Sequence, residues 1–328
     1  MKQNTRDFSP AVRRVRRRGV GLLVAAGLCL SAFGAVRAQA EPELIVADQK
    51  GQQKALMEAA GVDHTTGYHI RWVEFDAAAP LLQALGAGAV DTGIVGDGPF
   101  VFAWGAGLDV KAVWRVPQHQ PGRATAVIAA DGSPITTPAQ LSGKRIATGR
   151  GSIGHLLLLR LLATGAIPAP APELVFLLPV QAKAALDTGR VDAWSTWEPY
   201  VSLAVVAGHA HVVADAQGLM PNDGFFVASS TALAEKSAQL VDFYHRVTDA
   251  YKWGIGHKAD YVQLFARQTG MPEPVAAAAA DKLMATPGPV TAQTVKAEEA
   301  VAEAYRAAGM LARADGFQGA FVQDFSGP

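Results

Sequence analysis

Three short segments combine glycine with residue types that suit an anion-binding site: Gln49-Lys50-Gly51, Gly96-Asp97-Gly98-Pro99 and Arg150-Gly151-Ser152. In each, an expected strand ends and an expected helix begins, and glycine lets a ligand approach the backbone closely. The first amides of a helix lack intrahelical acceptors and carry a partial positive charge. Such helix starts bind anions without a metal.

The energetics require that these segments act together. One helix start contributes about 0.3–1 kcal/mol to anion binding, and up to about 2 kcal/mol when it is partly buried. A micromolar ligand needs about 8 kcal/mol. Several segments must therefore converge, aided by charge-assisted hydrogen bonds of about 1.5–3 kcal/mol each. Any one of them alone could be a tight turn, but three in a repeated frame indicate binding.

Four side chains near these segments have more than one possible role. His155 lies four residues after Gly151, where it could donate to an anion or belong to the core or surface. Trp197, at the end of an expected strand, would offer an apolar wall to an organic ligand. Asp97 and Glu198 could form an acid pair for hydrolysis, cap helix starts, or bind a cationic group of a ligand.

Other catalytic and cofactor-binding motifs are incomplete or absent from the sequence. Residues 149–154 match G-x-G-x-x-G between a strand and a helix, but the acid expected at the end of the next strand is missing, because Glu173 precedes that strand. The sequence also lacks a G-x-x-x-x-G-K-[ST] loop, a nucleophile elbow and any metal-binding histidine spacing. We therefore expect no cofactor and no metal.

The elements that would position these residues alternate between strands and helices. Strands are expected at 44–48, 70–75, 92–95, 110–115, 124–129, 145–148, 174–178, 193–196, 212–214 and 225–229. Helices are expected near 52–60, 78–88, 99–106, 138–142, 152–164, 180–189 and 199–207. This alternation predicts a parallel α/β fold. Helices at 231–254, 257–269, 272–284 and 291–308 would then pack over it.

An internal repeat predicts two similar α/β lobes. Ala84-Leu85-x-x-Gly88-x-Val90-Asp91 recurs 101 residues later as Ala185-Leu186-x-x-Gly189-x-Val191-Asp192. A shift of 100 relates Gly51 to Gly151 and Pro99 to Pro199. Open α/β sheets bind ligands beyond the carboxyl ends of their strands, so matching loops of two lobes would build one cleft. Chance similarity of a common helix–strand corner is the alternative.

Composition separates an N-terminal leader from the body of the chain. The 328 residues are 50% hydrophobic and include one Cys, which excludes a disordered chain and a disulfide scaffold. Arg13–Arg18, the apolar residues 19–35 and Ala38-Gln39-Ala40 predict a secretory signal peptide at 1–40, cleaved after Ala40. An uncleaved anchor and twin-arginine export are alternatives. Residues 41–328 carry a net charge of −7, which argues against a nucleic-acid partner.

Several segments together resemble one family of binding proteins. They are Ala47-Asp48-Gln49-Lys50-Gly51, Trp72-Val73-Glu74-Phe75, Gly96-Asp97-Gly98-Pro99, Gly151-Ser152 through His155, and Val191 through Tyr200. These segments are similar to the periplasmic substrate-binding proteins of ABC importers for sulfonates, taurine and nitrate, above all to aliphatic-sulfonate-binding proteins. The resemblance implies a type II periplasmic binding fold, an α/β fold of two lobes with a cleft between them and a helical C-terminal region. Lobe 1 would comprise 41–128 and 226–328, and lobe 2 would comprise 129–225.

The resemblance also implies a function. A periplasmic monomer that is not an enzyme would close on a small anion of the alkanesulfonate class and deliver it to an ABC permease in the inner membrane. The residues that would line the cleft are Gln49, Gly51, Gly96, Asp97, Gly151, Ser152, His155, Trp197, Glu198 and Phe225.

The sequence departs from the family pattern at four positions. Ile153 and Gly154 stand where serines are frequent, Glu198 replaces a more usual Asp, and Phe100 replaces a second Pro. The alternatives are therefore a protein that binds taurine, nitrate or another small organic anion, an exported hydrolase that uses Asp97 and Glu198, and a ligand sensor.

Overall fold

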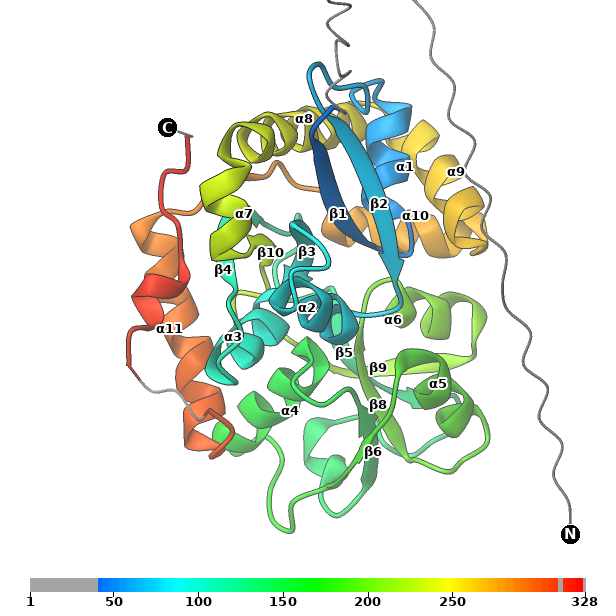
Figure 1. Ribbon diagram of the computed structural model, residues 1–328. Helices are drawn as coiled ribbons and strands as arrows, with labels where there is room; N and C mark the ends of the chain where they lie inside the picture. Colours follow the sequence, from blue (N-terminus) through cyan, green and yellow to red (C-terminus); the bar gives the residue numbers. More distant parts are fainter. Residues whose placement is uncertain (1–40, 312–314, 327–328) are drawn as a thin grey trace, which may run out of the picture. The chain divides into compact units, whose positions relative to one another are not determined.

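The computed structural model describes residues 41–311 and 315–326 (Figure 1). The expected signal peptide and its cleavage site lie outside these residues. Residues 41–328 form one compact unit. Among the described residues, no helix has the length and apolarity needed to cross a membrane.

The unit contains two β-sheets. The first has the strand order β11-β4-β10-β3-β1-β2. Its strands are β1 (Glu43–Gln49), β2 (His69–Phe75), β3 (Thr92–Gly96), β4 (Lys111–Val116), β10 (Gly224–Ala228) and β11 (Gly288–Pro289). The second has the order β7-β6-β8-β5-β9. Its strands are β5 (Thr125–Ala130), β6 (Arg145–Thr148), β7 (Glu173–Phe176), β8 (Ala193–Trp197) and β9 (Ala210–Asp215).

Both sheets are mixed, which corrects the expectation of purely parallel sheets. β1 is parallel to β2 and β3, but β10 runs antiparallel to β3 and β4. β6 is parallel to β7 and β8, but β5 runs antiparallel to β8 and β9. A parallel neighbour needs a long crossover, usually a helix. β5 and β10 are each reached directly from the other sheet, through residues 117–124 and 216–223, so this constraint does not apply to them.

The lobe limits given above stay a prediction. The sheet membership of β5 and β10 favours boundaries a few residues earlier than 128 and 225.

Helices cover the faces of both sheets. Those up to residue 207 are α1 (Gln52–Ala59), α2 (Ala78–Gly86), α3 (Asp97–Gly105), η1 (Pro138–Leu141), α4 (Ile153–Ala163), α5 (Pro179–Asp187), α6 (Tyr200–Ser202) and η2 (Leu203–Ala207). The C-terminal region is helical as expected. It comprises α7 (Ser230–Glu235), α8 (Ser237–Gly256), α9 (Lys258–Thr269), α10 (Glu273–Leu283), α11 (Ala292–Ala307) and η3 (Phe317–Ala320). The single helix expected at 231–254 is interrupted at Lys236, whose backbone is not helical.

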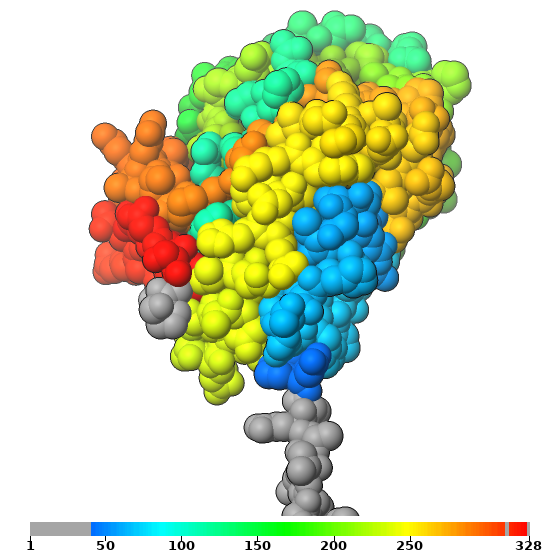
Figure 2. All heavy atoms as spheres, turned by 90° about the horizontal axis from the view of Figure 1, so that it is seen from above, coloured from blue at the N-terminus to red at the C-terminus, as the bar shows by residue number. Residues whose placement is uncertain are grey.

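Three clusters of buried side chains hold these layers together. One packs the first sheet against α8, α9 and α10, and includes Val46, Phe226, Tyr244, Phe265 and Ala280. In Figure 2, α8 (yellow) covers the surface between the N-terminal segments (blue) and the C-terminal segment (red). A second cluster packs the second sheet against α5 and α6, and includes Ile128, Leu186, Trp194 and Val201. The third spans both sheets through α3, α4 and α11, and includes Val95, Phe100, Ile146, Leu157 and Tyr305.

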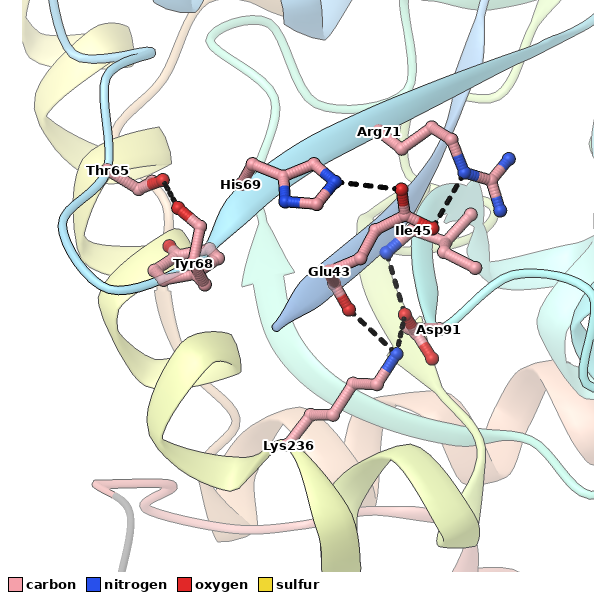
Figure 3. Close-up of polar contacts among 8 residues, drawn as sticks. All are labelled: Glu43, Ile45, Thr65, Tyr68, His69, Arg71, Asp91 and Lys236. Carbon is pink, nitrogen blue, oxygen red and sulfur yellow. Dashed lines mark hydrogen bonds and ion pairs between the residues drawn. The ribbon is translucent and has the colours of Figure 1, made fainter. Parts of the chain in front are cut away.

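The repeated Val-Asp corner performs the same structural task in both halves. The Asp91 amide donates to the Ile45 carbonyl over 2.8 Å, and the Ile45 amide donates to the Asp91 carboxylate over 2.7 Å. Asp192 makes the same two bonds with Arg145, both of 2.8 Å. Lys236 also donates to the Asp91 carboxylate (Figure 3). These aspartates join neighbouring strands and have no contact with a ligand site.

Asp91→Ala should therefore lower the free energy of unfolding by about 1–3 kcal/mol, because it leaves the Ile45 amide without its acceptor and removes the ion pair of Lys236, whose ammonium keeps the Glu43 carbonyl. Urea unfolding measures this change. A variant with unaltered stability but weakened ligand binding would contradict the structural role.

Candidate ligand-binding cleft

A cavity of about 490 Å³ lies between the strand ends of the two sheets. Such a volume falls in the range of about 300–1,000 Å³ that is typical of small-molecule sites. The segments that line it follow β1, β3, β6, β7 and β8, and both passages between the sheets contribute as well. The three glycine-containing segments named above thus border one hollow, as the sequence predicts.

Of the ten residues expected to line the cleft, six do so: Gln49, Gly96, Gly151, Ser152, Trp197 and Glu198. Gly51, Asp97, His155 and Phe225 lie outside the cavity lining. Their surroundings show what each of the four does instead.

Phe225 belongs to the core. Its side chain is fully buried, with ring centroids 5.7 Å from Phe100 and 6.1 Å from Phe321. Its neighbour Gly224, the first residue of β10, borders the cavity, and Phe225 lies one residue further into the sheet. Gly51 has a φ of 68°, and a Cβ at this position would meet the Gln268 side chain. It therefore makes the left-handed turn into α1 without contributing to the cavity wall.

His155 supports the segment before α4 from behind. Its Nδ1 accepts a hydrogen bond of 3.1 Å from the Gly151 amide, which places the proton of the neutral ring on Nε2. Burial, with a smaller contribution from Arg150, lowers the pKa of His155 to about 4. Tyr305 on α11 adds a hydrogen bond from its hydroxyl to the Ser152 carbonyl, over 3.1 Å. His155 is therefore neutral and stabilises the loop at Gly151, and it is not placed as a donor to an anion.

Asp97 sits within a buried acidic cluster. Its amide donates to the Asp223 carbonyl over 2.9 Å, and its carboxylate accepts from the Gly98 amide over 2.6 Å. Burial and the nearby Asp223 raise the pKa of Asp97. Glu298 of α11 is fully buried beside them, and burial, Asp97 and Asp223 raise its pKa well above the usual range. Neither carboxylate oxygen of Glu298 has a hydrogen-bond partner among the described residues.

Asp97 and Glu198 do not form the acid pair that was one of their three possible roles. Glu198 is buried and bound by Lys282 and Ser202, whereas Asp97 faces its own acidic neighbours. This arrangement offers neither a pair of acids for hydrolysis nor a shared site for a ligand cation.

The three helix starts differ in the amides that they leave free. At α1, the amides of Gln53 and Lys54 donate to the Asp48 carboxylate over 3.2 and 2.9 Å. At α3, the Gly98 amide donates to Asp97 and Pro99 has no amide hydrogen. The helix starts of α1 and α3 are therefore largely occupied by carboxylates of this chain.

At α4, the amides of Ile153 and Gly154 donate to no acceptor in the described part of the chain. Ile153 also borders the cavity. Of the three helix starts, that of α4 therefore has a free amide on a residue that borders the cavity.

A cation borders the same cavity as Ile153. The Arg150 guanidinium is 4.0 Å from the centre of the Phe176 ring, a cation–π contact, and both residues border the cavity. Arg150 forms no ion pair with a carboxylate in residues 41–311 and 315–326. Lys50 holds the corresponding place in the other half of the repeat but is paired with Asp76. Of the two cationic side chains that line the cavity, Arg150 is therefore the one without a carboxylate partner among the described residues.

Other lining residues have no counterpart among the sequence expectations. Tyr251 and Tyr261 come from α8 and α9, and Leu283 and Met284 come from the end of α10. The sequence presents these helices only as covers of the core. Asp48 also borders the cavity, and burial raises its pKa to about 6.

The comparisons with known proteins agree with the motif resemblance. The family described as NMT1/THI5 like matches residues 52–260. A protein of Escherichia coli (strain K12) named for binding aliphatic sulfonates is 31% identical over 293 residues, which cover 88% of this chain and 91% of that one. The taurine-binding periplasmic protein of the same organism is 31% identical over 179 residues, 53% of this chain and 54% of its own.

Solved structures confirm the expected fold. The alkanesulfonate-binding protein SsuA from Xanthomonas axonopodis pv. citri, bound to MOPS, superposes with a TM-score of 0.77 at 30% identity. The match covers 87% of this chain and 99% of that one. The two-sheet α/β architecture is thus that of the periplasmic binding proteins, and the chain, which is similar to aliphatic-sulfonate-binding proteins, belongs to the NMT1/THI5-like family.

Proposed function

We propose that this protein is the periplasmic solute-binding component of an ABC importer and that it binds an aliphatic sulfonate in the cavity between its sheets. The observation that carries this proposal is that Arg150, without a carboxylate partner, and Ile153, whose amide has no acceptor among the described residues, both border a cavity whose other walls are largely apolar. The relatives named for sulfonate binding support the same ligand class.

The chemistry of a sulfonate matches these groups. A sulfonate is a permanent anion with three acceptor oxygens at physiological pH. Arg150 offers a planar fork of N–H donors, and the start of α4 adds backbone amides and the positive end of its dipole. Trp197, Phe176 and Tyr200 border the same cavity and provide apolar surface for the organic part of the ligand.

Taurine is the second candidate. Asp48 borders the cavity, where it could face an ammonium group, and one relative is named for taurine binding. Nitrate is disfavoured because so small an ion would leave most of a 490 Å³ apolar-walled cavity unfilled. A hydrolase is disfavoured because Asp97 and Glu198 do not meet.

Transport would follow from closure of two lobes. The division into 41–128 with 226–328 and 129–225 places the moving joints near the two passages between the sheets. Export through the signal peptide at 1–40 would bring a monomer to the periplasm, and the closed form would engage the permease.

Calorimetric titration of the purified protein with ethanesulfonate, taurine and nitrate tests the proposal. We expect saturable binding of ethanesulfonate and weaker or absent binding of nitrate. No heat from any sulfonate would overturn the sulfonate assignment. Mass spectrometry of the recovered ligand should show it unchanged, whereas a cleaved product would identify an enzyme.

A further inference from the structure

Glu198 has an unusual setting for a residue that borders the cavity. Its side chain is 0% exposed and its carboxylate accepts from the Ser202 amide over 3.1 Å and from the Ser202 hydroxyl over 2.9 Å. The Lys282 ammonium forms an ion pair with the same carboxylate and lies 3.3 Å from the Ser202 hydroxyl. Both carboxylate oxygens of Glu198 are therefore bound by Ser202, and one of them also by Lys282.

The two charged partners are carried by elements that pack against different sheets. Lys282 is on α10, whose Ala276 and Ala280 pack in the core of the first sheet. Glu198 directly follows β8 and precedes Tyr200 and Val201, which pack in the core of the second sheet. Figure 1 shows α10 and α6 next to each other where the two halves meet. The ion pair thus bridges the two halves of the molecule.

The end of α10 joins the bridge to the cavity and to one passage between the sheets. The Gln120 amide, in the first passage, donates to the Lys282 carbonyl over 3.1 Å, and its side chain donates to Asp281 over 3.2 Å. Leu283 and Met284, the next residues after Lys282, border the cavity. Separation of the halves at this point would therefore open the cavity wall.

We propose that Glu198 is a positioning residue that retains the ligand through Lys282, by stabilising the arrangement in which the two halves enclose the cavity. This rests on the proposed function. The ion pair exists only while α10 and the β8–α6 loop are together, so it shifts the population towards the enclosed arrangement and raises the apparent affinity. Loss of Lys282 leaves the buried carboxylate without its cation, which makes that arrangement costly.

The proposal differs from direct recognition of the ligand by Glu198. If Glu198 acts through Lys282, Glu198→Gln does not weaken binding further once Lys282→Met has removed the cation, and it relieves the cost of the unpaired buried carboxylate. Glu198→Asp should resemble Lys282→Met, because a side chain shorter by one methylene keeps the charge but loses reach to α10. If Glu198 instead contacts the ligand, the increases in Kd caused by Lys282→Met and Glu198→Gln multiply in the double variant.

The first experiment measures ethanesulfonate binding and dissociation in a double-mutant cycle. We expect Lys282→Met and Glu198→Gln each to raise Kd about tenfold, mostly through faster dissociation, and the double variant to bind no more weakly than Lys282→Met alone. Lys258→Met is the matched control, because Lys258 pairs with Asp281 of the same helix at the exposed surface. Near-wild-type Kd values in both single variants, or a product of effects near 100-fold, would overturn the proposal.

A second measurement needs no ligand and separates this inference from the proposed function. Residues 41–328 contain no cysteine, so spin labels can be attached at Ala184→Cys on α5 and Ala238→Cys on α8, both exposed. Lys282→Met should lengthen or broaden the distance distribution between the labels, and Lys258→Met should not. Identical distributions in the wild type and Lys282→Met would refute the bridge. Failure of the wild type to bind any sulfonate would instead refute only the proposed ligand.

Discussion

Arg150→Ala should raise the Kd for ethanesulfonate about 100-fold, because it removes two charge-assisted hydrogen bonds worth about 1.5–3 kcal/mol each, partly replaced by water. Arg150 stacks on Phe176 at the cavity wall and has no carboxylate partner among the described residues, so its charge is available to a ligand. The loop that carries it is held from behind by His155 and Tyr305, which keeps the guanidinium in place without the ligand. Calorimetry measures the change.

Two variants serve as controls for Arg150→Ala. Lys50→Ala removes the cation at the matching position of the repeat, but Lys50 is already paired with Asp76 and should change Kd less than about tenfold. Arg150→Lys keeps the charge and loses the planar fork, so its Kd should lie between those of the wild type and Arg150→Ala. Wild-type affinity in Arg150→Ala would contradict the placement of the anion beside α4.

Glu298→Gln should raise the free energy of unfolding by up to about 3 kcal/mol at pH 7. Glu298 is fully buried on α11, and neither of its carboxylate oxygens has a hydrogen-bond partner in the described structure. Asp97 and Asp223 are the acids that face it, and the guanidinium of Arg115 is bound to Asp223. Glutamine retains the shape and removes the need to hold a proton, and the substitution breaks no hydrogen bond.

The pH dependence follows from the direction of the pKa shift. Burial raises the pKa of Glu298 in the folded protein above its ordinary value of 4.5, so the folded state binds this proton more tightly than the unfolded state does. The contribution of Glu298 to the free energy of unfolding is then greatest below pH 4.5. It is lost as the pH rises through the folded pKa, at up to about 1.4 kcal/mol per pH unit. Burial also raises the pKa of Asp48, to about 6, and the pKa of Asp97. Both groups therefore lower the free energy of unfolding further as the pH rises.

Urea unfolding between pH 5 and pH 8 tests this account. The advantage of Glu298→Gln over the wild type should grow with pH and vanish near pH 4.5. Glu299→Gln, its exposed neighbour on α11, should show no such trend. A pH-independent difference for Glu298→Gln would show that the carboxyl is not protonated in the folded protein.

The elements were predictable wherever their signals are local. The expected strand at 145–148 coincides with β6, and the glycines after β1 and β6 mark the turns into α1 and α4. The repeated Val-Asp corner also pointed to matching halves, which the twin bonds of Asp91 and Asp192 now explain. The direction of β5 and β10 was not predictable, because it depends on how the chain passes between sheets far apart in sequence.

The loops that border the cavity were predictable from the sequence, but the orientation of their side chains was not. Gly96, Gly151 and Trp197 border the cavity because they lie at or just after the carboxyl ends of strands. The burial of Asp97 and His155 depends on α11, more than a hundred residues later, and no local pattern encodes that packing. Tyr251 reaches the cavity from α8, a helix whose periodicity reads only as core.

The central claim is that the start of α4 and Arg150 hold an anion in the cavity between the sheets. A crystal structure with bromoethanesulfonate tests it most directly, since the anomalous signal of bromine fixes the orientation of the ligand. We predict sulfonate oxygens within hydrogen-bond distance of the Ile153 amide and the Arg150 guanidinium, with bromine towards Trp197. A sulfonate bound at α1 or α3, or outside this cavity, would contradict the account.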